Sequence, residues 1–479
     1  PHSRMKIVRA ILSAAAVVAL AGCATYSDST ANMRSDFRAG NFAAAAGDAS
    51  RQCKGAQGSG DELIWLLETG STARAANMLS ESSNAFERAE KLFLKYDAEG
   101  GAGIGDEAAA VVLNQTYLPY TGYNYDRIMA AAYQALNLIE LKNFEEAEVW
   151  LKKLENFQSD AEAKNRRRID SQMAALEKAQ SENGKKNYDV GRTLANSSVR
   201  GKLAEYYGAD FLSPNAAVLA KGVYTNPFAY WLAGLYFSNR PADMSDKSRA
   251  ADFFRLANQS CEGGNKVAAL DALRAEALAN GSAPDMGNFT YAIFESGMAP
   301  IRRQFRIDLP LYVFGETLPF VGLNFPYLLP SQYKPLPPKF SGGGKNADFF
   351  KIADMDSIIS REFKNELPLV ITRTVLSAAV KAGAQFAAQY AVRENSLALL
   401  AVVITGTAYQ LITNDADLRT WTTLPKSIYI AKLPTPPDGI VEIGGRKVSV
   451  DTEGSCVIVA KQISPTAPLF VRKFNFKQK

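Results

Sequence analysis

The chain has 479 residues, of which 47% are hydrophobic and 22% charged, which is the usual composition of a globular protein. At this length we expect two or three domains. The formal charge of +5 falls to near +2 once Arg4, Lys6 and Arg9 of the N-terminal segment are set aside, because the 54 basic residues become 51 against 49 acidic ones. So small a charge argues against a nucleic-acid-binding protein.

The N-terminal segment has the layout of a secretory signal. Lys6 and Arg9 precede an apolar run from Ala10 to Leu20, and small residues follow up to Cys23. The run is only about half of the ~20 residues that a membrane-spanning helix needs. Leu-Ala-Gly-Cys resembles the lipobox of bacterial lipoproteins, in which the signal is cut before the cysteine and the cysteine is acylated. We therefore predict a signal over residues 1–22 and lipidation at Cys23. The alternative is an ordinary signal peptide with an incidental cysteine.

Acylation of Cys23 predicts a permanent membrane anchor, because each buried methylene contributes about 0.8 kcal/mol to membrane binding. Residue 24 is Ala and not Asp. By resemblance to lipoprotein sorting, this favours the outer membrane, and we expect the body of the protein to face the periplasm. The small polar residues that follow predict a tether over 23–32.

Histidine and cysteine usage limits the possible chemistry. The single histidine is His2, upstream of the predicted cleavage site. The processed chain therefore lacks histidine-dependent catalysis and imidazole metal sites. Cys53, Cys261 and Cys456 are far apart and form no Cys-x-x-Cys motif, so we expect buried or free thiols. We predict no cofactor and no metal.

Residues 33–285 have the pattern of paired helices. Gly-Asn-Phe-x-x-Ala at 40–45 and Lys-Asn-Phe-x-x-Ala at 142–147 resemble the turn and second-helix start of tetratricopeptide repeats. Alanine at such positions lets two helices approach closely. Gly70 is expected at a turn between helices. The spacing is irregular, so a plain helical bundle remains the alternative.

Residues 286–479 predict an α+β domain, which makes the whole chain an α+β multidomain protein. We expect a loop over 314–346, where prolines are frequent, and two helices over 368–391 and 395–412. A buried helix hairpin is favoured over a membrane hairpin because Arg373 and Lys381 interrupt the first helix. Alternating apolar and β-branched residues predict strands over 289–297, 305–313, 348–355, 427–433, 439–451 (a hairpin turned by Gly444 and Gly445), 455–463 and 468–476.

Two glycine-rich stretches look like phosphate-binding loops at first sight. The stretch 100–107 follows a helix and is flanked by acids, whereas a nucleotide loop follows a strand, so we interpret it as an interhelical loop. The stretch 342–345 lacks the first glycine of a Walker A loop, and Asn346 stands where that loop needs Ser or Thr.

Two motifs are candidates for a ligand site or a structural corner. The first, ESGMAPIRRQFRI at 295–307, ends a predicted strand and begins a basic cluster. The second, DADLRTWTTLP at 415–425, places an acid and a base two residues apart, which allows a bidentate ion pair with an indole packed beneath it. The structural corner is the favoured interpretation. The candidate residues are Glu295, Gly297, Pro300, Arg302, Asp417, Arg419 and Trp421.

Together, the lipobox, the helical repeats, NPFAYWLAGLYF and these two motifs resemble an uncharacterised family of bacterial lipoproteins with tetratricopeptide-like repeats. Its first motif reads Glu-x-Gly-x-Ala-Pro-x-Lys, where this chain has Arg302 in the basic position. The second motif, Ala-Asp-x-Arg-x-Trp-x-x-Leu-Pro, matches residues 416–425. The family resemblance implies a function in the cell envelope, associated with cell-wall synthesis, and assigns no role to any residue.

These observations predict a lipid-anchored outer-membrane scaffold that binds envelope proteins, in cell-wall synthesis or surface assembly, and not an enzyme. A helical-repeat arm offers a surface for a peptide or a partner helix. One alternative is an enzyme that acts on peptidoglycan or peptide through carboxylates such as Glu295 or Asp417. Another is a membrane-associated subunit of an export or surface assembly that uses residues 370–412.

Overall fold

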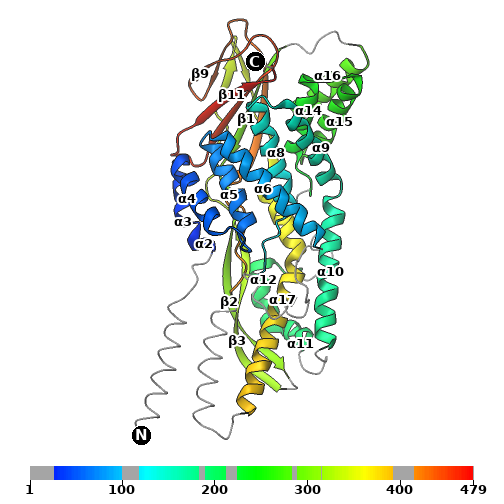
Figure 1. Ribbon diagram of the computed structural model, residues 1–479, viewed down its shortest axis with the longest axis vertical. Coiled ribbons are helices and arrows are strands. Elements are labelled where there is room, and N and C mark those ends of the chain that lie inside the picture. The colour runs from blue at the N-terminus through cyan, green and yellow to red at the C-terminus, as the bar shows by residue number, and fades with distance from the viewer. Residues whose placement is uncertain are drawn as a thin grey trace.

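The computed structural model describes residues 26–99, 118–182, 189–211, 224–282, 288–313, 316–391 and 415–477. These residues form a mixed α+β protein, with helices first and strands after, as the sequence predicts (Figure 1). The predicted signal 1–22, Cys23, the loop 100–107 and the helix 395–412 lie outside the described residues.

The helices of the described residues lie mostly in the first part of the chain. Their bounds are α2 Tyr26–Ser29, α3 Ala31–Ala39, α4 Phe42–Gly55, α5 Glu62–Ala75, α6 Leu79–Ala98, α8 Asn124–Glu140, α9 Phe144–Ser159, α10 Ala161–Glu182, α11 Val190–Ala195, α12 Ser197–Tyr207, α14 Pro227–Asn239, α15 Met244–Ser260, α16 Lys266–Ala279 and α17 Met355–Ala391.

The strands form a five-stranded sheet in the order β11-β10-β1-β7-β6, a four-stranded sheet in the order β5-β4-β8-β9, and the ribbon β2-β3. Their bounds are β1 Phe289–Ser296, β2 Ile301–Val313, β3 Glu316–Leu329, β4 Phe340–Gly342, β5 Lys345–Ala347, β6 Phe350–Asp354, β7 Ser427–Pro434, β8 Ile440–Ile443, β9 Arg446–Ser449, β10 Cys456–Gln462 and β11 Phe470–Asn475.

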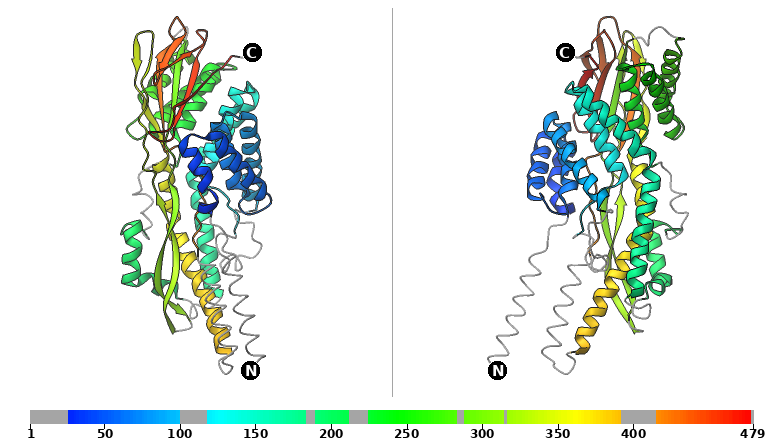
Figure 2. Two further views of the ribbon diagram at one scale, coloured as in Figure 1. Left: turned by 90° about the vertical axis from the view of Figure 1, so that its left-hand side faces the viewer. Right: turned by 45° about the vertical axis from the view of Figure 1, so that its right-hand side comes forward.

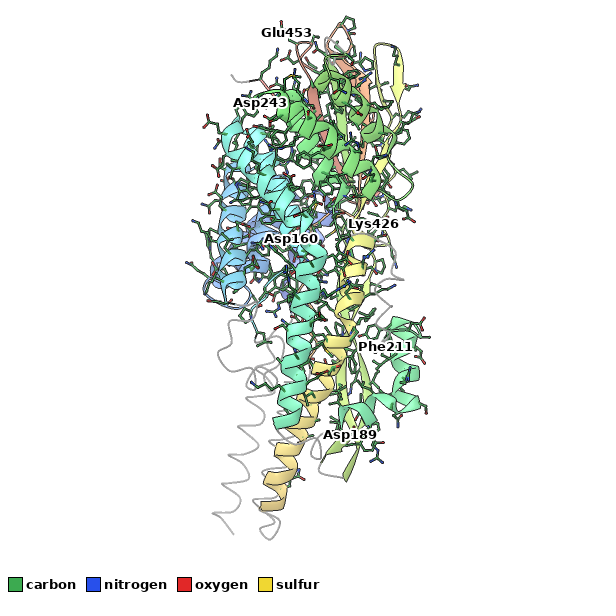
Figure 3. The ribbon with its side chains drawn as sticks, turned by 90° about the vertical axis from the view of Figure 1, so that its right-hand side faces the viewer. Asp160, Asp189, Phe211, Asp243, Lys426 and Glu453 are labelled. Carbon is green, nitrogen blue, oxygen red and sulfur yellow. The ribbon has the colours of Figure 1, made fainter. Side chains whose placement is uncertain are left out.

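The molecule is elongated and has two parts, which we call the head and the stem (Figures 1 and 2). The head holds α2–α9, α14–α16 and the two larger sheets, and the stem holds α10–α12, the β2-β3 ribbon and most of α17. Figure 3 shows Asp243 and Glu453 on the head, Asp189 and Phe211 on the stem, and Asp160 near the junction.

The main hydrophobic core lies in the head and the second lies in the stem, so the cores do not coincide with the predicted domains. The main core of the head joins helical residues such as Phe37 and Trp231 to Trp421 and Ile428. A second core joins Leu203 to the ribbon and α17. The helical region predicted over 33–285 is therefore not one continuous array. The helices α10–α12 leave it because their apolar faces pack on β2, β3 and α17.

Turns between helices repeat one geometry. Gly40, Asn77 and Lys142 have positive φ angles of 86°, 63° and 66°, which places each in the left-handed region that ends many helices. The next residue in each case donates its N–H to a carbonyl five residues back, at 2.8 Å. Gly70, in contrast, is not at a turn as predicted. It lies inside α5, where an added Cβ would be 2.5 Å from the ring of Phe86, so close helix packing explains this glycine.

The predicted loop over 314–346 is wrong for most of its length. Residues Glu316–Leu329 form β3, which pairs antiparallel with β2, and a small hairpin of β4 and β5 follows. Pro319 and Pro326 are compatible with β3 because the ribbon has only two strands, so one edge of each strand needs no partner. The other predicted strands are confirmed, including the hairpin turned by Gly444 and Gly445.

Two further predictions need correction. The helix predicted from 368 begins at Met355 and runs through Pro368, because the preceding turns bury Ile359 and Phe363 against the two cores. The part of the tether over 26–32 is not free chain: it forms α2 and the start of α3. Within the described residues, no helix combines the length and the apolar character needed to span a membrane.

Candidate functional site

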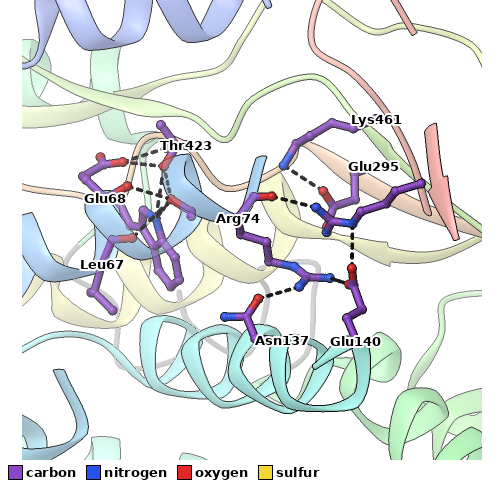
Figure 4. A network of polar contacts seen from close by, with 11 residues as sticks. Leu67, Glu68, Arg74, Asn137, Glu140, Glu295, Thr423 and Lys461 are labelled. Carbon is purple, nitrogen blue, oxygen red and sulfur yellow. Dashed lines mark hydrogen bonds and ion pairs between the residues drawn. The ribbon is translucent and has the colours of Figure 1, made fainter. Parts of the chain in front are cut away.

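Helix α5 carries three polar residues at intervals of three, Glu68, Ser71 and Arg74. This spacing places them along one side of the helix. The helix is buried almost throughout, and these three side chains are at most 3% exposed. We call these three residues the α5 stripe. Buried charges are costly unless they are paired, so the groups that contact the stripe indicate what Glu68 and Arg74 do in the structure. The stripe has two ends with different surroundings (Figure 4).

At the first end, the Glu68 carboxylate accepts five hydrogen bonds. The backbone N–H and hydroxyl groups of Thr422 and Thr423 supply four, and the Tyr26 hydroxyl supplies the fifth at 2.9 Å. Burial raises the pKa of Glu68, and these hydrogen bonds oppose the rise. Trp421 donates its indole N–H to Ser71 at 2.9 Å. This end therefore fastens the motif at 415–425 to α5.

The same motif contains the expected bidentate ion pair. Arg419 donates to both carboxylate oxygens of Asp417, at 2.9 and 2.7 Å, and also to Asp61 and to the Leu118 carbonyl. Burial acts to raise the pKa of Asp417, but the charge and hydrogen bonds of Arg419 outweigh it and hold this pKa below its usual value. Asp417 and Arg419 thus form a structural corner.

The motif at 295–307 lies beside the motif at 415–425 because β1 and β7 pair antiparallel, with Glu295 opposite Ile428. Gly297 has a φ of 69°, and an added Cβ there would be 2.9 Å from the Tyr333 carbonyl oxygen, so this turn requires glycine. The buried Pro300 completes the turn into β2. These two residues shape the corner and contribute no polar side chain.

Arg302 is buried at the start of β2, in the upper stem. Its guanidinium lies 4.7 Å from the ring centroid of Tyr123 and 5.2 Å from that of Phe363. Burial opposes its charge, but nearby tyrosines and Asp417 raise the pKa of Arg302 above its usual value. Arg302 therefore stays charged and packs the stem against the N-terminal end of α8.

At the second end of the α5 stripe, Arg74 enters a network of charges. It donates to Asn137 and to Glu140, both at 2.6 Å. Arg472 of β11 lies 3.2 Å from the other oxygen of Glu140 and donates to the Arg74 carbonyl. Glu140 thus holds the two arginines side by side.

The sheet adds a second ion pair to this network. Glu295 of β1 and Lys461 of β10 are parallel register partners, and their charged groups are 2.7 Å apart. Burial acts to raise the pKa of Glu295, but Lys461 and the two arginines hold it below its usual value. Burial lowers the pKa of Lys461, and Glu295 opposes this. Burial and the neighbouring Arg74 lower the pKa of Arg472 to about 10.

A cavity of about 210 Å³ opens within this network, and we call it the basic cavity. One wall is polar and the other is apolar. Its lining residues are Phe42, Ser71, Arg74, Ala75, Asn77, Tyr133, Glu295, Val459, Lys461, Phe470, Val471 and Arg472.

Tyr133 of α8 is the exceptional residue of the basic cavity. Its side chain is 1% exposed, and its hydroxyl has no hydrogen-bond partner of standard geometry among the described residues. Arg74 lies 5.6 Å and Lys461 6.0 Å from its ring centroid. Burial, the charge of Glu295 and a poorly aligned hydrogen-bonding contact with that carboxylate raise the pKa of Tyr133 well above its usual value, so the hydroxyl remains a donor.

A wider depression of about 430 Å³ lies next to β11 on the other side of Glu140. Its basic residues already have acceptors: Lys142 donates to the Asn475 carbonyl, and Lys477 lies 3.2 Å from Asp451. Among the described residues that line this depression, none has a buried donor without a partner, as Tyr133 does in the basic cavity. The basic cavity is therefore the better candidate site.

Of the predicted site residues, only Glu295 lines the basic cavity. Asp417, Arg419 and Trp421 belong to the first end of the stripe, and Gly297, Pro300 and Arg302 to the turn and upper stem. Sequence reasoning missed Arg74, Tyr133, Glu140, Lys461 and Arg472. The available signal was a charge inside an apolar segment, as in ELIWLLETGSTARA for Arg74 and CVIVAKQ for Lys461.

The three cysteines of the described residues, Cys53, Cys261 and Cys456, are free. Within the same residues, no group of three or more His, Cys, Asp or Glu side chains is arranged to hold a metal ion. Comparisons of the chain with protein-family models, with curated proteins and with solved structures gave no match. The functional argument therefore rests on the sequence motifs and on the geometry of the head.

Proposed function

We propose that this chain is a lipid-anchored protein of the bacterial outer membrane that binds another envelope protein and acts as a scaffold. The observation that carries the proposal is an exposed apolar face on α16. Leu270 and Leu273 are adjacent on this helix and are 48% and 64% exposed. Helix α16 packs on α15 and β7 and lies at the edge of the head (Figure 2). Clustered exposed apolar side chains are a common feature of protein contacts, and this pair of leucines is the basis of the proposal.

The helix pairs of the head support a tetratricopeptide-like origin for this surface. Gly70 of α5 lies against Phe86 of α6, and Gly234 of α14 lies against Phe254 of α15 in the same way. In both pairs a glycine in the first helix makes room for a phenylalanine of the second. Shared packing of this kind, with the shared turn geometry, is what diverged repeats retain. Repeat arrays commonly bind partners along their helices.

The position of Tyr26 supports a short attachment to the membrane. Its hydroxyl donates to Glu68, and the same group contacts the Thr420 carbonyl at 3.1 Å. Three residues of extended chain reach at most about 10 Å. An acylated Cys23 would therefore hold the junction of head and stem directly at the membrane surface.

The enzyme alternative receives less support from the carboxylates that suggested it. Glu295 is paired with Lys461 and Asp417 with Arg419, and the pKa of each carboxylate is below its usual value. A general acid needs a proton at the working pH, which these environments disfavour, and a lowered pKa also makes each carboxylate a weaker general base. The membrane-subunit alternative makes a different prediction: a secreted Cys23→Ala protein would still need detergent.

Site-specific photocrosslinking in native envelopes tests the scaffold proposal. A photoreactive amino acid at position 273 should give one reproducible adduct with an envelope protein, identified by mass spectrometry. The same residue at position 94 is the control, because Leu94 is 54% exposed on α6, away from this face. Cys23→Ala should move the protein out of the membrane fraction. Equal adducts from both positions, or none from 273, would contradict the proposal.

A further inference from the structure

The basic cavity contains two buried donors that have no well-aligned acceptor. They are the Tyr133 hydroxyl and the Nε–H of Arg74, whereas the Nε of Arg472 lies 3.2 Å from Glu140. Buried polar groups are almost always hydrogen-bonded, and each one left unpaired costs about 1–3 kcal/mol. Both groups belong to residues that line one cavity. An acceptor placed in the cavity would satisfy them.

The charges around the basic cavity do not cancel. Arg74, Lys461 and Arg472 are positive, and Glu295 on the wall and Glu140 behind it are negative. Both carboxylates are already engaged by these cations. One positive charge remains, so the guest that balances the site is a monoanion. A dianion such as phosphate would leave an excess negative charge in a buried setting.

The remaining wall of the basic cavity is apolar. Phe42 and Phe470 lie with their ring centroids 4.3 Å apart, and Val459 and Val471 come from neighbouring strands. Ala75, Phe470 and Val471 are only partly buried, so the cavity reaches the surface of the head. A guest that fits must carry an apolar group beside its negative charge.

We propose that the basic cavity binds a carboxylate attached to a small branched apolar group. The carboxylate accepts from Tyr133 and Arg74, and the apolar group packs against Phe42, Phe470 and the valines. Two sources share this chemistry: a free small acid, and the C-terminal residue of a peptide. This inference does not depend on the lipid anchor or on the apolar face of α16.

Calorimetric titration of the full-length protein in detergent tests this inference. The probe is N-acetylvaline, and N-acetylvalinamide is the neutral control of the same shape. The acid should bind and the amide should bind at least tenfold more weakly. Acetyl-Ala-Ala-Val with a free carboxylate distinguishes the sources. Binding of this peptide as tight as that of N-acetylvaline indicates a peptide C-terminus, and weaker binding indicates a free acid.

Three variants locate the site. Tyr133→Phe removes one hydrogen bond to a charged group and should weaken acid binding about tenfold. Tyr125→Phe is the matched control, because Tyr125 is also buried on α8 but its hydroxyl lies near Thr420. Ala75→Leu should fill the cavity and abolish binding while the protein stays folded. Equal affinity for acid and amide, no binding at millimolar concentrations, or equal affinity of the Tyr133→Phe and unaltered proteins would overturn the proposal.

Discussion

Helix α5 carries a buried acid and a buried base on one side, and the structure surrounds them in opposite ways. Glu68 is fully buried and accepts five hydrogen bonds, and it is not among the residues that line the basic cavity. Arg74 keeps an Nε–H without a partner among the described residues, and it lies beside a cavity and the Tyr133 hydroxyl, which has no well-aligned acceptor there. A buried polar group that is fully hydrogen-bonded holds the fold together. Buried donors that face a cavity are instead available to a ligand.

The largest loss of stability should come from substitution of Glu68. Glu68→Ala leaves the donors of Thr422, Thr423 and Tyr26 without their acceptor in a buried setting. We expect the free energy of unfolding to fall by about 4 kcal/mol. Urea denaturation followed by tryptophan fluorescence measures this change. A loss below about 1 kcal/mol would show that Glu68 does not hold the segment in place.

The second-largest loss of stability should come from the ion pair of Glu295 and Lys461 beside the basic cavity. Lys461→Met leaves Glu295 buried without its closest cation, and we expect a loss of about 3 kcal/mol. The double variant Glu295→Met with Lys461→Met should recover most of it, because a well-packed apolar pair can replace a buried ion pair. Calorimetric unfolding of the single and double variants provides the comparison. Additive losses in the double variant would contradict a direct pairing.

The buried carboxyl group of Asp126 should make the stability of the fold depend on pH. Burial raises the pKa of this α8 carboxyl to about 7, although it accepts from Tyr120 and from the Tyr123 N–H. The folded protein therefore holds a proton that the unfolded chain releases near pH 4. Its contribution to stability is complete below that pH and declines by at most about 1.4 kcal/mol per unit up to pH 7. Unfolding measured from pH 4 to 8 should show this decline, and Asp126→Asn should remove it.

The smallest loss of stability should come from Tyr133 and Tyr26, two tyrosines whose hydroxyl groups have different partners. Tyr133→Phe removes a buried hydroxyl without a well-aligned partner, so the free energy of unfolding should not fall and should rise by at most about 1–3 kcal/mol. Tyr26→Phe removes a donor to Glu68 and should cost about 1.5 kcal/mol. Denaturation of both variants under one condition sharpens the comparison. Equal losses would mean that Tyr133 has a structural partner.

Much of the fold could be predicted from the sequence because it depends on local patterns. Alternating apolar residues predict β1, β7 and β10, and the glycines at 444 and 445 predict the β8–β9 turn. The errors arose where distant packing decides the outcome. The residues around Gly70 predict a turn, but in the structure this glycine lies inside α5 and makes room for the ring of Phe86. The prolines of β3 signal a loop, but a two-stranded ribbon leaves a free edge for them.

The candidate site was less accessible to sequence analysis for a related reason. The pair of Asp417 and Arg419 is two residues apart, so its geometry can be expected from the chain alone. The basic cavity instead takes Arg74 from α5, Tyr133 from α8 and Arg472 from β11. Only the sheet register and the packing of α5 on it bring these side chains together. A single sequence contains no signal for that convergence.

A crystal structure with 2-bromo-3-methylbutyrate, a branched acid whose bromine is located by anomalous scattering, is the decisive test of the basic cavity as a carboxylate site. We expect a bromine peak beside Phe42 and Phe470, with the carboxylate within hydrogen-bond distance of the Tyr133 hydroxyl. An empty basic cavity at saturating acid, or an acid bound with its carboxylate away from Tyr133 and Arg74, would contradict it.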